Sequence, residues 1–167
     1  LPRSRRSDLA GLSRASLLVV MAYLLFCGGN RWLAERALAR EAAALGSPPS
    51  FSYVFPEPLG PHRWRGVLRH ADTYRLYLIH SLTGEAEKRG EVKSRLEDQA
   101  VQAARASPLG IRLERFFKAP VWEVSKPASP VEVRARDLRF SSLVLGREPV
   151  FVFSFRVTPG GQVREER

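Results

Sequence analysis

The sequence predicts an α+β protein: an N-terminal membrane helix with a helical stalk, then a mostly antiparallel sheet of about six strands with two short helices on one face. Three observations predict this fold. An uncharged apolar run lies near the N-terminus, several later segments alternate with the period of a strand, and two short amphipathic segments with helix caps lie among them. We expect residues 1–46 to form the helix and stalk, 47–158 a soluble domain and 159–167 a charged tail.

The apolar run reads ASLLVVMAYLLFCGG from Ala15 to Gly29 and carries no charge. Arg14 and Arg31 flank it, and a helix would separate them by about 25 Å, close to the hydrocarbon thickness of a bilayer, about 30 Å. Residues 31–45 continue in strong helix formers and predict a stalk that runs on into water until Gly46 ends it. The expected partner of this segment is the lipid bilayer.

Three other interpretations of the same run compete with a membrane span. The basic start and apolar core fit a secretory signal, but the helical continuation favours an anchor. A lipoprotein signal would use Cys27, yet Phe26 stands where a small residue is expected. A buried helix of a soluble domain is disfavoured because the run is apolar all round. Arginines lie on both sides of the run, so the positive-inside rule leaves the orientation open.

The soluble domain begins with strand patterns. Residues 51–56 are aromatic and β-branched, and a hairpin is expected from residues 63–69 and 73–81 around a turn at 70–72. Residues 84–90 are charged and expected to be exposed. Two helices should follow: one begins at Ser94 with a capping box, and the next begins at Ser107 with a proline in its first position. Strands are then expected at 121–124, 131–140 and 150–157.

The charge balance narrows the partners. Lys and Arg number 27 against 17 Asp and Glu, a formal net charge of +10, which suits nucleic acid, anionic lipid or an acidic ligand. The arginines are spread along the chain and form neither a basic run nor a stripe with aromatic residues, which argues against nucleic acid. Cys27 is the only cysteine, so an internal disulfide and a cysteine-rich zinc site are excluded.

Catalytic residues are not predicted from any motif. The sequence holds no phosphate-binding loop, Gly-X-Ser-X-Gly elbow or His-Glu-X-X-His pattern. His70 and Asp72 form a His-X-Asp pair that could supply two metal ligands, but no third ligand has a useful spacing, so no metal is expected to be bound by this chain. A surface or capping role is favoured for the histidines.

Four further residues are candidates for a structural or ligand-facing role. Asp137 and Arg139 lie two apart on an expected strand, where a charge facing the core must be paired. We expect them to fix the strand against a neighbouring loop, with an electrostatic site for a ligand or membrane as the alternative. Trp64 and Trp122 are expected in the core or at the membrane interface rather than as ligand platforms.

The order of these parts resembles a known family. The membrane helix, stalk and Pro-rich stretch are followed by the strand that ends at Trp64, by Phe116-Phe117, by Pro120 with Trp122, and by the Asp-Leu-Arg-Phe element at 137–140. Together they resemble the C-terminal region of the bacterial inner-membrane metal-dependent hydrolases, multi-span proteins of which some are induced by DNA damage. The resemblance covers most of residues 10–157.

The resemblance implies a bacterial inner-membrane location and a divalent metal in the full-length protein. In that family the metal-binding histidines and aspartates lie in the N-terminal membrane half, which this chain does not contain. The chain would then be the last membrane helix and soluble tail, docking or contacting substrate beside an upstream membrane domain; its start at Leu1 fits a fragment. The alternative is a single-pass anchored interaction module whose basic surface meets lipid headgroups or a protein partner.

Overall fold

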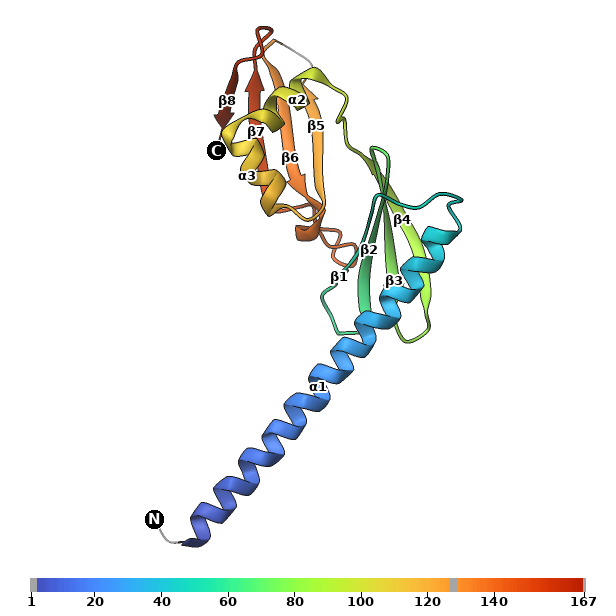
Figure 1. The fold of residues 1–167 in the computed structure, drawn as a ribbon, viewed down its shortest axis with the longest axis vertical. Coiled ribbons are helices and arrows are strands. Elements are labelled where there is room, and N and C mark those ends of the chain that lie inside the picture. Colours follow the sequence, from blue (N-terminus) through green and yellow to red (C-terminus); the bar gives the residue numbers. More distant parts are fainter. Residues whose placement is uncertain (1–2, 127–128, 167) are drawn as a thin grey trace.

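A computed structural model describes residues 3–126 and 129–166 and has the α+β fold expected (Figure 1). Within this part of the chain, eight strands form two separate antiparallel sheets of four strands each, in place of one sheet of about six. In chain order the elements are α1 Arg3–Ala43, β1 Phe51–Pro56, β2 Arg63–His70, β3 Thr73–His80, β4 Glu85–Lys93, α2 Gln99–Ala106, α3 Pro108–Phe116, β5 Pro120–Lys126, β6 Val131–Asp137, the 3-10 helix η1 Leu138–Phe140, β7 Val152–Val157 and β8 Val163–Glu166.

Helix α1 is a single uninterrupted helix with two different halves (Figure 1). Its N-terminal half projects away from the rest of the molecule, and the large apolar side chains between Leu17 and Phe26 are 48–71% exposed. From Gly11 onward the helix is long and apolar enough to cross a membrane. The expectation of a helix with the length and apolarity of a membrane span is therefore confirmed.

The C-terminal half of α1 packs on the first sheet, whose strand order is β1-β2-β3-β4. Ala34, Ala37 and Leu38 are buried against Trp64 and neighbouring side chains of β1, β2 and β3. The expectation of a stalk running through water is therefore wrong for this half. Small residues on one helix face allow the close approach, and Gly66 of β2 lies directly beneath Leu38.

The second sheet has the order β5-β6-β7-β8, and α2 and α3 cover one of its faces. Trp122 lies at the centre of this core with Phe155, and their ring centroids are 5.5 Å apart. Ser107 caps α3 as expected, with its Oγ accepting from the Gly110 N–H at 3.1 Å. A third cluster joins the sheets and contains Phe55, Val67, Tyr74, Leu76, Ala119, Val121 and Leu138.

Several local expectations need correction. Residues 85–90 are mostly exposed, as expected, but they belong to β4, which pairs with β3 although most of its own residues are charged. Helix α2 is capped by Asp98, not by Ser94, whose buried Oγ instead accepts the Trp122 N–H. The strand expected at 131–140 ends at Asp137 because its carboxylate caps η1. Part of the expected tail forms β8, which pairs with β7.

Candidate functional site

A partly exposed cluster of three aromatic rings and one arginine lies where α3, η1 and the segment before β7 meet. The Arg139 guanidinium lies 5.1 Å from the Phe116 ring centroid and 4.4 Å from that of Phe140. The Phe140 and Phe151 rings meet edge to face at 4.8 Å. Phe116 is 60% exposed and Phe151 49% exposed. We call Phe116, Arg139, Phe140 and Phe151 the aromatic–arginine cluster.

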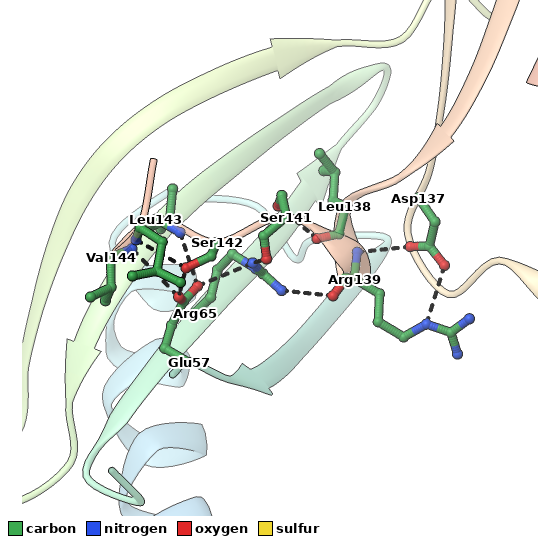
Figure 2. Close-up of polar contacts among 10 residues, drawn as sticks. Glu57, Arg65, Asp137, Leu138, Arg139, Ser141, Ser142, Leu143 and Val144 are labelled. Atoms are coloured by element: carbon green, nitrogen blue, oxygen red, sulfur yellow. Dashed lines mark hydrogen bonds and ion pairs between the residues drawn. The ribbon is translucent and has the colours of Figure 1, made fainter. Parts of the chain in front are cut away.

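Asp137 fixes the position of Arg139 (Figure 2). Its carboxylate is fully buried and accepts the backbone N–H groups of Lys118, Ala119 and Arg139 at 2.9–3.1 Å. The Arg139 Nε lies 3.4 Å from the same carboxylate. A buried charge is stable only when it is fully paired in this way. The pair therefore fixes the end of β6 against the loop before β5, and it aims Arg139 at the exposed rings.

A second buried pair lies against the segment 139–144, which follows β6 (Figure 2). Arg65 of β2 donates to Glu57 Oε1 at 3.1 Å, and both side chains are buried. The same guanidinium donates to the carbonyls of Ser141 and of Arg139, the latter at 3.0 Å. Burial lowers the pKa of Arg65, and the Glu57 carboxylate opposes that shift.

Glu57 is saturated by donors from the second half of the molecule. Besides Arg65 it accepts the Ser142 hydroxyl at 2.5 Å, the Leu143 N–H at 3.1 Å and the Val144 N–H at 3.4 Å (Figure 2). Glu57 and Asp137 thus use their oxygens on structural donors, which leaves neither free to act as a general base or metal ligand. Glu57 joins the first sheet to the loop that follows β6, whereas Asp137 fixes the end of β6 within the second half of the molecule.

The remaining predicted site residues lie apart from this cluster. His70 is exposed at the β2–β3 turn, with Nδ1 3.4 Å from Ser47 Oγ. Asp72 lies 3.3 Å from the Lys93 ammonium. Burial disfavours the Asp72 charge, but the Thr73 hydroxyl and Lys93 outweigh it and lower its pKa. Within residues 3–126 and 129–166, no three His, Cys, Asp or Glu side chains gather as metal ligands.

Both candidate tryptophans are core residues. Trp64 is buried against α1, and its Nε1 donates to the Pro61 carbonyl at 2.9 Å. Trp122 is fully buried, and its Nε1 donates to Glu114 Oε1 at 2.7 Å. Neither ring is available as a platform for a ligand. The exposed tryptophan is Trp32 on α1, with the Arg36 guanidinium 4.7 Å from its centroid.

A buried polar junction joins the apolar half of α1 to the first sheet. Asn30 is 3% exposed, and its Oδ1 accepts the Ser81 hydroxyl at 2.5 Å. Its Nδ2 donates back to the Phe26 carbonyl at 2.8 Å. The Ser81 N–H donates to the His62 carbonyl at 2.9 Å, so two loops of the sheet meet at this point of the helix. The junction holds the sheet against α1 where its exposed apolar segment ends.

Sequence reasoning missed Glu57, Arg65 and Asn30. A signal exists for Asn30, because one amide in a long apolar helix is expensive unless it is hydrogen-bonded. Arg65 gave no signal, since it shares the expected solvent-facing side of the strand with Arg63 and Arg69. Comparison of the chain with protein-family models, curated proteins and solved structures finds no match.

Proposed function

We propose that this chain is a membrane-anchored binding domain, in which α1 crosses the bilayer and the aromatic–arginine cluster receives a protein partner. The observation that carries the proposal is the continuity of α1. One helix passes without a break from an exposed apolar segment into the core of the first sheet, and the Asn30–Ser81 contact locks it there. Such a helix would hold the domain at a fixed height and angle on the membrane.

The aromatic–arginine cluster supports the binding role. Phenylalanine and arginine are enriched at protein interfaces, and exposed rings around a fixed arginine are typical of binding hot spots. Val150 and Val152 add exposed apolar surface next to Phe151. A groove of about 720 Å³ continues the surface along α3 and is lined by Leu109, Arg112, Leu113, Phe116, Phe153 and Glu165.

The resemblance supplies the proposed context. The chain would be the C-terminal portion of a bacterial inner-membrane metal-dependent hydrolase, and the partner of the cluster would be the upstream membrane half that carries the metal ligands. In that arrangement the domain orients the membrane half or contacts its substrate, and it performs no chemical step. The alternative is a single-pass interaction module that binds a separate protein.

The anchor is tested by alkaline carbonate extraction of cells that express the chain. The chain should stay with the membrane, and a Leu18→Arg/Leu24→Arg variant should be released, since each arginine at the middle of a span costs about 2.5–3.5 kcal/mol. Ile111→Arg/Leu145→Arg is the control because it adds the same charges at exposed apolar positions outside α1. Release of the unmodified chain, or equal release of both variants, would contradict the anchor.

The binding role and its context are tested with the full-length gene. Several upstream spans bearing His and Asp would support the hydrolase context, and stoichiometric zinc or manganese should then appear in the full-length protein. Phe116→Asp should release a separately expressed upstream half from this chain, while Ile111→Asp, also exposed on α3, should not. A start codon just before Leu1 would rule out the hydrolase context and leave the single-pass module as the proposal. Stoichiometric metal bound by this chain alone would contradict the placement of the metal ligands in the upstream half.

A further inference from the structure

We propose that the loops at 57–62 and 81–84 form a second contact with the membrane beside α1, in which Leu59 and Leu82 enter the interfacial layer of the bilayer. The inference rests on the proposed anchor. It adds that the first sheet lies directly on the lipid surface, so that three points of the chain fix the orientation of the domain.

The two loops lie together at one end of the first sheet, and this end faces the apolar half of α1 (Figure 1). The register pairs Arg63 with His80, so the loop before β2 and the loop after β3 end side by side. The Ser81 N–H joins them through the His62 carbonyl at 2.9 Å. Both loops therefore lie beside the point where the exposed segment of α1 meets the domain.

The loops cannot swing away from this point of the helix. Ser81 hydrogen-bonds to Asn30, and one helical turn of apolar residues separates Asn30 from Phe26. On the far side of the loop, Arg40 Nη2 donates to the Gly84 carbonyl at 2.8 Å. If α1 crosses the bilayer as far as Gly29, these contacts hold both loops at the level of the headgroups.

The chemistry of the loop tips suits that level. Leu59 and Leu82 are each 66% exposed, and Leu59 holds this position with φ at +71°, a region that bulky residues rarely adopt. Pro58 and Pro61 beside it have no backbone N–H that would lose water on entering the interface. Trp32 on α1, with Arg36 over its ring, is the amphipathic kind of residue found at membrane–water boundaries.

The opposite end of the same sheet has a different surface. Its β2–β3 turn carries Ala71 at the tip, and Asp72 pairs there with Lys93. Charged and small residues of this kind remain in water. The contrast between the two ends of one sheet argues that the leucines mark a lipid-facing end and are not a general property of its loops.

The test measures the depth of single labels in vesicles of phosphatidylcholine with anionic phosphatidylglycerol. The full chain carries Cys27→Ser, and an environment-sensitive fluorophore is attached to one new cysteine at a time: Leu18→Cys, Leu59→Cys, Leu82→Cys or Ala71→Cys. Nitroxides attached to shallow or deep positions of the lipid report contact with the bilayer, and iodide reports contact with water. Tryptophan emission of each variant checks that the domain is folded.

We expect deep quenching at position 18, shallow quenching with blue-shifted emission at 59 and 82, and iodide quenching alone at 71. Quenching at 18 with only iodide access at 59 and 82 would overturn this inference and leave the anchor intact. Protection of 59 and 82 from both quenchers would also overturn it, because protein would then cover the loops. Absence of lipid quenching at 18 would contradict the proposed anchor itself. Leu59 and Leu82 are independent probes, so misfolding of one variant leaves the other to decide.

Discussion

Replacing Glu57 by leucine should weaken the whole molecule and uncouple its two sheets. Glu57 and Arg65 are buried and paired with each other, and together they hold the first sheet to the loop at 139–144 through five hydrogen bonds (Figure 2). Removing the carboxylate leaves the Arg65 charge with two carbonyl acceptors and no counter-charge. It also leaves the Ser142 hydroxyl and two backbone N–H groups without their acceptor.

The expected loss follows from these contacts. Breaking a buried ion pair by removing one partner costs about 3–5 kcal/mol. The two carbonyls that still accept from Arg65 reduce this loss, whereas the buried Ser142 hydroxyl left without its acceptor adds about 1–3 kcal/mol. The Leu143 and Val144 N–H groups belong to half-buried residues and add less. We expect Glu57→Leu to lower the free energy of unfolding by about 4 kcal/mol, a large part of the 5–15 kcal/mol typical of a domain.

The assay is urea unfolding of the full chain in detergent micelles. Trp64 lies in the core of the first sheet and Trp122 in that of the second, so variants that lack Trp32 and keep one of these two report each sheet separately. With Glu57 present, both probes should follow one transition because the sheets share the cluster around Tyr74 and Leu138. With Glu57→Leu, the two midpoints should fall and separate.

A matched pair of variants separates the ion pair from the loss of packing. Arg65→Met alone should also destabilise the chain, but the double variant Glu57→Leu/Arg65→Met should be more stable than Glu57→Leu, because no unpaired charge then remains buried. Additive losses in the double variant, or a Glu57→Leu midpoint equal to that of the unmodified chain, would refute the reasoning.

Three further predictions concern single positions. Gly110→Ala should lower the free energy of unfolding by at least about 1–3 kcal/mol, since its Cβ would lie 2.8 Å from the Arg105 Cα, whereas Gly90→Ala, with open space, should be nearly neutral in the same urea titration. Asp137→Ala should cost about 3 kcal/mol, measured as a lower Tm, because three backbone N–H groups lose a charged acceptor. Burial raises the pKa of Tyr74 above its usual 10.0, so near and above pH 10 the folded chain keeps a proton that the unfolded chain loses. The free energy of unfolding should therefore fall as the pH rises above about 10. Tyr74→Phe should make this fall less steep, and an unchanged slope would contradict the prediction.

The elements that the sequence predicts well carry their own signal. The apolar run of α1 needs no partner to be recognised, and the β2–β3 hairpin combines alternation with a turn at Ala71. The start of α3 follows from Ser107 and Pro108 alone. In each case the local chemistry and the tertiary structure favour the same conformation.

The elements that the sequence does not predict depend on distant residues. Strand β4 is exposed along most of its length, so the backbone of β3 stabilises it rather than any apolar pattern of its own. The end of β6 depends on the Asp137 carboxylate, which accepts N–H groups from residues 118 and 119 as well as from Arg139. Division into two sheets is likewise a tertiary outcome, because β4 and β5 each lie at a sheet edge.

The candidate site likewise combines a contact that the sequence predicts with contacts that depend on the folded chain. Pairing of Asp137 with Arg139 follows from their spacing, because a core-facing charge requires a partner. The rings around Arg139 come from α3, η1 and residue 151, which only the folded chain brings together. Arg65 reads as a surface residue until the second sheet covers its face of β2.

The most direct test of the central claim, that α1 crosses the lipid and leads rigidly into the domain, uses four successive positions. Labels at Leu17, Leu18, Val19 and Val20 point to all sides of the helix, and all four side chains are exposed. In vesicles, nitroxides deep in the bilayer should quench all four labels to a similar extent. Quenching of the labels on one side of the helix only would contradict the account. Absence of quenching at all four positions, with tryptophan emission that shows a folded domain, would contradict it as well.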